Sequence, residues 1–133
     1  YYIEVEERYI PALRGLEEYS HINVLWWFSG ADDDASRSAL TASPPHKGAP
    51  KETGVFSTRS PRRPNPIGLT ASKVLGIDFD KGIVQIAFID ANDGTPVLDV
   101  KPYVPEFDRV EYPSAPAWCA GLPESPDDAD RRN

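Results

Sequence analysis

The richest chemistry in this sequence lies in a short loop, TRSPRRPNP, which runs from Thr58 to Pro66. Three prolines hold φ at about −65° and disfavour helix at the residue before each of them, so the loop is predicted to be stiff and non-helical. Onto this backbone the sequence places three guanidinium groups, those of Arg59, Arg62 and Arg63. A planar guanidinium pairs well with carboxylate or phosphate. The loop is therefore predicted to bind a polar anion at little entropic cost.

The charge around the loop also favours an anionic partner. From Lys47 to Lys73 there are six basic residues and one acidic residue, a balance of +5 in a chain of net charge −7, so the rest of the chain carries −12. Such segregation is typical of a surface that meets an anion. Two other interpretations stay open. Pro61 and Pro64 with their arginines form a PxxP motif, a ligand of aromatic-grooved domains, and the arginines of an ordinary loop would pair with surface carboxylates.

Two further short stretches carry groups suited to a site. Ser20 and His21 stand at the entrance of the apolar run HINVLWWF, where a hydrogen-bonded structural histidine is the alternative. Asn92-Asp93-Gly94 is a strong turn signal, because these residue types accept left-handed conformations and bring backbone amides close to a ligand. A turn without further role is the alternative there. The triplet 32–34 lacks the spacing of a calcium loop, so it indicates a solvated face and no metal site.

Three blocks, in order along the chain, resemble the TsaA/TrmO-type (YaeB-like) family of S-adenosylmethionine-dependent tRNA methyltransferases. They are GLEEYSHINVLWWF (15–28), GVFSTRSPRRPNPIGL (54–69) and DANDGTPVLDVKPYVP (90–105). The resemblance implies a mainly β fold, a small closed or nearly closed mixed β-barrel with one or two short helices, and not a Rossmann fold. It also implies methylation of the exocyclic nitrogen of threonylcarbamoyl-adenosine next to the tRNA anticodon, with S-adenosyl-L-methionine as cofactor.

The resemblance assigns roles to individual residues. It places the cofactor at Ser20, His21, Arg63, Ala91, Asn92, Asp93 and Gly94. Arg59, Arg62 and Asn65 are expected to bind the substrate by contacting RNA phosphates or the threonyl carboxylate. If the acceptor nitrogen must lose a proton, His21 and Asp93 are the catalytic candidates. Methyl transfer from a sulfonium chiefly requires that donor and acceptor be held in line, so no nucleophilic side chain is needed. The sequence accordingly has no Ser-His-Asp, HExxH or CxxC pattern. The absence of GxGxxG argues against a Rossmann methyltransferase.

The chain departs from the family pattern in three places. Within residues 1–133 there is no match to the family's strand with a Ser-Pro-aromatic element, which helps to hold the cofactor, and no match to the extra C-terminal domain of some members. Arg62 stands where a bulky apolar residue is common. Since no methionine is present, we expect that Tyr1 is not the natural start. Two rival classes stay open: an S-adenosylmethionine-binding module or small-molecule methyltransferase without tRNA activity, and a Pro/Arg-loop interaction domain.

Length and composition predict one globular domain with one core, since the chain has 133 residues, 40% hydrophobic and 26% charged. We expect a single barrel domain at 1–118, lacking its natural N-terminal strand, and an acidic Pro/Asp-rich tail at 119–133. The single cysteine, Cys119, leaves no internal disulfide and fits a cytoplasmic location. No apolar run reaches the roughly 18 residues of a membrane span. The expected partners are tRNA, bound transiently through the basic loop, and a second copy of the chain, because HINVLWWF is apolar on both faces.

Local patterns predict the elements that position these groups. Strands are expected at 1–6, 21–28, 67–77 and 83–89, with a tight hairpin turn at 80–82. Short helices are expected at 8–18, ending near Gly15, and at 34–40, capped by an aspartate within a long connection. Trp118 is expected to pack against the barrel.

Overall fold

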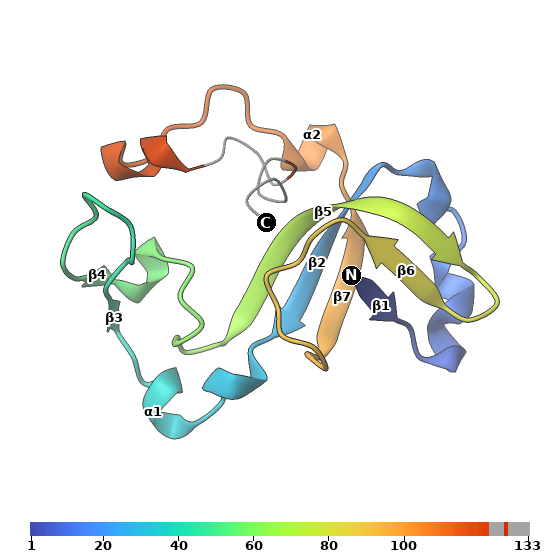
Figure 1. The fold of residues 1–133 in the computed structure, drawn as a ribbon, viewed down its shortest axis with the longest axis horizontal. Helices are drawn as coiled ribbons and strands as arrows, with labels where there is room; N and C mark the ends of the chain where they lie inside the picture. The colour runs from blue at the N-terminus through green and yellow to red at the C-terminus, as the bar shows by residue number, and fades with distance from the viewer. Residues whose placement is uncertain (123–126, 128–133) are drawn as a thin grey trace.

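The structure is a computed structural model that describes residues 1–122 and Asp127. Its strands are β1 (Tyr2–Glu4), β2 (His21–Trp27), β3 (Thr41–Ala42), β4 (Thr53–Gly54), β5 (Ile67–Asp78), β6 (Ile83–Ile86) and β7 (Val97–Pro102). Its helical segments are short: α1 (Asp34–Arg37), α2 (Pro105–Asp108) and the 3-10 turns η1 (Glu7–Leu13), η2 (Leu16–Glu18), η3 (Ser29–Ala31), η4 (Val55–Ser57) and η5 (Ala117–Gly121). The predicted mainly β fold with few short helices is confirmed (Figure 1).

Five strands form one sheet in the order β1-β6-β5-β2-β7, and β3 and β4 form a separate ribbon (Figure 1). Within residues 1–122 every strand pairing is antiparallel. We expected a mixed, closed or nearly closed barrel, but the sheet of this part of the chain is open, because its end strands β1 and β7 do not pair. Parallel pairs need long crossover connections, usually helical, and the connections between these strands carry only short helices and turns.

The core lies on one face of the sheet. Successive side chains of a strand point to opposite faces, so β2 buries Ile22 and Val24 completely and leaves Trp26 only 3% exposed. Ile22 and Val24 pack in one cluster with residues of β1, η1 and β6, namely Ile3, Leu13, Val84 and Ile86. The opposite face of β2 is half-buried. The predicted two-faced apolar strand is therefore buried on one face only.

The β5–β6 hairpin forms as predicted. The Asp78 carboxylate accepts hydrogen bonds from the amides of Asp80 and Lys81 at 3.1 and 3.0 Å, which closes the turn. Gly82 has φ of +67°, and a Cβ there would lie 2.6 Å from Ile10 Cγ1, so any other residue would be strained at this position. β6 ends at Ile86 rather than Ile89, and the chain then leaves along the edge of β5, where the Phe88 amide donates to Ser72 Oγ at 3.2 Å.

Both predicted helices form in shorter pieces. The segment 8–18 is divided at Gly15, which has φ of 94° and separates η1 from η2. α1 starts where predicted and is capped by Asp33, whose carboxylate accepts from the Ser36 amide at 3.0 Å. It ends at Arg37 instead of Leu40.

Residues 41–66 form an arm that contains β3, β4, η4 and the basic loop, and it projects from the sheet on the left of Figure 1. The ring of Trp118, in η5, stacks on His46 of this arm with centroids 5.6 Å apart and planes 16° apart. The expectation that Trp118 packs against a barrel is therefore wrong. It contacts the tip of the arm instead.

Candidate functional site

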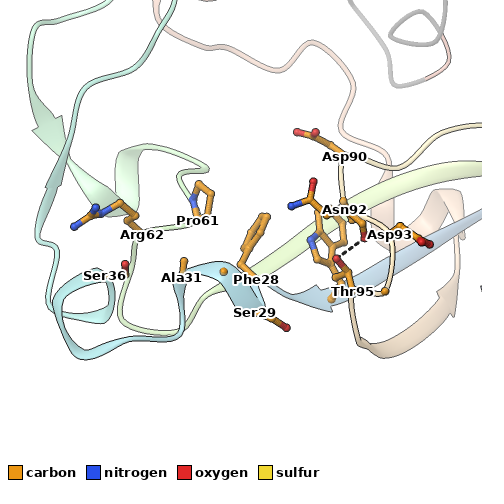
Figure 2. A pocket seen from close by; sticks show the side chains of 14 residues that line it. Phe28, Ser29, Ala31, Ser36, Pro61, Arg62, Asp90, Asn92, Asp93 and Thr95 are labelled. Carbon is orange, nitrogen blue, oxygen red and sulfur yellow. Dashed lines mark hydrogen bonds between the residues drawn. The ribbon is translucent and has the colours of Figure 1, made fainter.

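A pocket of about 540 Å³ lies at the end of β2 (Figure 2). Trp26 and Phe28 line it, and their rings meet edge to face with centroids 5.5 Å apart. The turn 90–95 lines the pocket from a distant part of the sequence, together with η3, Ser36 and the basic-loop residues Pro61 and Arg62. All three sequence blocks that resemble the family therefore contribute residues to this one pocket.

The turn predicted at Asn92-Asp93-Gly94 forms one side of this pocket. The Asn92 carbonyl accepts hydrogen bonds from the amide and the hydroxyl of Thr95, at 3.2 and 2.6 Å (Figure 2). Gly94 has φ of +79°, the left-handed conformation that its residue type permits. Backbone groups and the exposed side chains of Asn92 and Asp93 are thereby held at the pocket.

A glycine fixes the aromatic side of the pocket. Gly68 of β5 pairs with Trp26, and a Cβ at Gly68 would lie 2.1 Å from Trp26 Cε2. The indole therefore occupies the space that a side chain would take. The Phe28 amide donates to the Pro66 carbonyl at 2.7 Å, which ties the end of β2 to the end of the basic loop.

The three arginines of the loop differ in what they contact. Arg63 is half-buried, and its Nη1 donates to the carbonyls of Thr58 and Ser60 at 3.0 and 3.2 Å, so it braces the loop from within. Arg59 is exposed and donates to the Leu69 carbonyl of β5. Arg62 is exposed and lines the pocket. The resemblance assigned Arg63 to the cofactor and Arg59 and Arg62 to the substrate, and the internal bracing by Arg63 was not predicted.

Arg37, from α1, adds a second brace that the sequence did not indicate. Its Nε donates to the Pro64 carbonyl at 3.0 Å, and its guanidinium lies over the Trp27 ring, 5.4 Å from the centroid. Asn65 is exposed, and its carbonyl accepts from the Ile67 amide at 2.7 Å. The stiffness predicted from the prolines is thus reinforced by side chains inside and outside the loop.

Ser20 and His21 lie at the opposite end of β2 from the pocket. Ser20 Oγ and His21 Nδ1 are 2.7 Å apart, and His21 Nε2 lies 3.0 Å from both carboxylate oxygens of Asp127. His21 and Trp26 stand on one extended strand, so their Cα atoms are separated by roughly 17 Å at about 3.3 Å per residue.

The candidate residues therefore form two groups. The structure brings Ala91, Asn92, Asp93, Gly94 and Arg62 together at the pocket. The other candidates do not line that pocket, namely Ser20, His21, Arg59, Arg63 and Asn65. Trp26, Phe28 and Ser36 line the pocket and were not among the candidates. In the predicted strand 21–28, Trp26 shares a face with Ile22 and Val24 because successive side chains alternate. No local sequence signal indicated that the end of this strand lies beside the turn 90–95.

The electrostatics of the pocket are mixed. Asp90 and Asp93 supply carboxylates and Arg62 supplies a guanidinium. Just outside, hydrogen bonds from the Ser36 hydroxyl and amide lower the pKa of Asp33 below its ordinary value of 3.8, with a smaller contribution from the positive charge of Arg62. Within 1–122 and Asp127, no group of three or more His, Cys, Asp and Glu side chains is placed to hold a metal ion. In the same part of the chain, no helix has the length and apolarity to cross a membrane.

These features define a small antiparallel-β domain with a lined pocket at the end of a central strand, unlike the parallel sheets of nucleotide-binding folds. Residues 1–109 match the sequence model of the tRNA-methyltransferase O N-terminal domain, and the chain belongs to this family. The resemblance recognised from the three sequence blocks is confirmed.

Known relatives cover the same region. The chain is 43% identical over 108 residues to an S-adenosyl-L-methionine-binding protein of Archaeoglobus fulgidus, covering 81% of this chain and 72% of that protein. It is 45% identical over 100 residues to a tRNA (adenine(37)-N6)-methyltransferase of Mus musculus, covering 75% of this chain and 22% of that protein. The crystal structure of TrmO from Pseudomonas aeruginosa matches with a TM-score of 0.66 and 34% identity, covering 87% of this chain and 46% of that one. The chain thus spans most of one relative and less than half of the other two.

Proposed function

We propose that this chain is the methyl-transferring domain of an S-adenosylmethionine-dependent tRNA methyltransferase. Its target would be the exocyclic nitrogen of threonylcarbamoyl-adenosine next to the anticodon. The observation that carries the proposal is the pocket at the end of β2, which joins the turn 91–94, expected to hold the cofactor, to Arg62, expected to contact the substrate. The family and the printed names of the relatives support it, since one is named for S-adenosyl-L-methionine binding and another for methylation at adenine 37.

The pocket residues suit the proposed cofactor. A volume of about 540 Å³ falls within the range of about 300–1,000 Å³ typical of small-molecule sites. Trp26 and Phe28 offer aromatic surface to a purine ring, while Asp90 and Asp93 offer negative charge to a cationic ligand. When bound, S-adenosylmethionine supplies an electrophilic methyl group on a positively charged sulfur.

The chain's own contribution to catalysis is mainly positional. The braced loop and the hydrogen-bonded turn hold their groups in fixed places, which is what an in-line transfer requires. Asp93 lines the pocket and is the better candidate to accept a proton from the acceptor nitrogen. His21, at the other end of β2, reaches the same ligand only if a second chain brings it there.

A homodimer would unite the two groups of candidate residues. The open face of the β2–β5 pair carries Leu25, Trp27, Ile67 and Leu69, and of these Ile67 and Leu69 are 41% and 46% exposed. Such a surface suits a contact between two copies. If one chain's Ser20–His21 end meets the other's pocket, each site takes residues from both chains.

Mixing two inactive variants tests this arrangement. His21→Ala and Asp93→Asn should each lose activity, and a one-to-one mixture should recover about a quarter of it, because half of the dimers then hold one intact site out of two. If the mixture recovers no activity and the chain sediments as a monomer, the shared site is rejected. The pocket would then act within one chain.

The activity itself is tested in two steps. Calorimetry should show S-adenosylmethionine binding that weakens in Asp93→Asn, and nucleoside mass spectrometry should show one added methyl group on tRNA that carries threonylcarbamoyl-adenosine, with none on tRNA lacking that modification. Binding without tRNA methylation would favour a binding module or a small-molecule methyltransferase. Absence of binding would favour the Pro/Arg-loop interaction domain. The cytoplasmic location expected from the single cysteine stays a prediction.

A further inference from the structure

Phe56 is a large apolar side chain that the arm presents to solvent, with 81% of its surface exposed. Its backbone is held firmly. The neighbouring Val55 is only 3% exposed, and its amide donates to the Leu40 carbonyl at 2.9 Å. The Val55 carbonyl accepts from the amide and hydroxyl of Thr58, at 3.1 and 2.8 Å. The turn η4 is thus held by hydrogen bonds on both sides of Phe56, while the Phe56 ring remains exposed to solvent.

Cationic residues flank Phe56 in the sequence of the arm, with Glu52 as the one acidic residue among them. Lys51, Arg59 and Arg62 are exposed and stand within six residues of Phe56 in the sequence. Arg63 Nη1 donates to the carbonyl of Thr58, the residue that closes η4, so the turn and the basic loop form one braced unit. An exposed aromatic ring among cations is the combination that binds unpaired nucleic acid, because the cations track phosphates and the ring stacks on a base.

We propose that Phe56 is a stacking platform for an unpaired base of the RNA substrate, adjacent to the base delivered to the pocket. The inference rests on the proposed tRNA substrate. A base that enters a pocket leaves its stack and deprives its neighbours of stacking. The Phe56 ring replaces that stacking, because it belongs to the same arm as Pro61 and Arg62, which line the pocket. The local balance of +5 from Lys47 to Lys73 favours an anionic partner over a basic or neutral protein surface, and the exposed aromatic ring beside it favours an unpaired nucleic acid among anions.

RNA binding without cofactor tests the proposal. Fluorescence anisotropy with a labelled synthetic anticodon stem-loop should show Phe56→Ala binding about 5- to 100-fold more weakly than the parent chain, by an equal factor at low and high salt. The matched control is Phe107→Ala, since Phe107 is 80% exposed but lies in α2 between Glu106 and Asp108. It should bind like the parent, and Phe56→Tyr should retain binding. The loss in Arg62→Ala should shrink as salt rises.

Abasic substitutions in the RNA locate the stacked base. At one loop position, removal of the base should weaken binding to the parent chain and leave binding to Phe56→Ala unchanged, which is the signature of a direct pair in a double-mutant cycle. The proposal is overturned if Phe56→Ala binds the stem-loop like the parent chain, or if it loses affinity for fully paired RNA by the same factor as for the stem-loop. A change in self-association in sedimentation would overturn it as well. Base-specific stacking without methyl transfer would instead refute only the proposed reaction.

Discussion

Replacement of Gly68 by alanine is the sharpest test of how the pocket is built. The added Cβ would lie 2.1, 2.4 and 2.6 Å from Trp26 Cε2, Cζ2 and Nε1, where ordinary contacts begin at 3.4 Å. Since Trp26 is 3% exposed and belongs to a strand paired on both sides, the ring has little room to retreat. Overpacking of this kind costs about 1–3 kcal/mol. We expect Gly68→Ala to lower the free energy of unfolding by this amount and to weaken ligand binding in the pocket.

Gly76 provides a matched control on the same strand, because a Cβ there meets nothing within 4 Å. Gly76→Ala should stabilise the fold by about 0.4–1 kcal/mol through the unfolded state. In urea unfolding followed by circular dichroism, the two midpoints should differ by on the order of 1 M, given a slope of about 1–3 kcal/mol/M. The double variant Gly68→Ala/Trp26→Phe should recover part of the loss. Equal stability of the two glycine variants, or strict additivity in the double variant, would refute the steric reasoning.

Two further predictions concern the elements around the pocket. Hydrogen bonds from Ser36 lower the pKa of Asp33, so its capping contribution to α1 should be complete above pH 3.8 and should disappear as pH falls through the lowered pKa. Amide exchange at Ser36 measures this contribution, and Asp33→Asn should remove its pH dependence. Arg63→Ala should open the basic loop to limited proteolysis because two internal hydrogen bonds are lost, whereas Arg62→Ala should not, and equal cleavage of both variants would contradict the bracing role.

The sequence predicted the elements whose signals are local. A β-rich apolar run identified β2, alternation and a turn signal identified the β5–β6 hairpin, an aspartate marked the start of α1, and the turn at 92–94 formed where its residue types indicated. Strand ends were less accurate, because β6 stops where the Phe88 amide finds the Ser72 hydroxyl, a partner from another strand. Asp99 and Lys101, two residues apart on β7, form an ion pair with Nζ and Oδ2 3.2 Å apart, a contact between neighbours of the kind that local sequence indicates.

The pocket was beyond sequence reasoning because its parts come from separate segments of the chain. Trp26 reaches it through the register of β2 on β5, while Arg62 and Asp93 reach it through loops whose paths no periodicity encodes. The resemblance grouped His21 with Asp93, but the length of one strand separates them within the chain. The stacking of Trp118 on His46 likewise depends on where η5 crosses the arm.

The strand order also bears on how the chain acquires its fold over time. Tyr2 of β1 pairs with Gln85 of β6, and Ile22 of β2 pairs with Pro102 of β7. In each case the long stretch of chain between the two paired residues must close into a loop before the contact forms. Proteins dominated by such distant pairings fold slowly. During synthesis the residues of β1 therefore wait, unpaired, until β6 has left the ribosome. The most local pairing in the sheet is the β5–β6 hairpin, which needs only a short turn to close, and β2 and the two edge strands pair across longer loops.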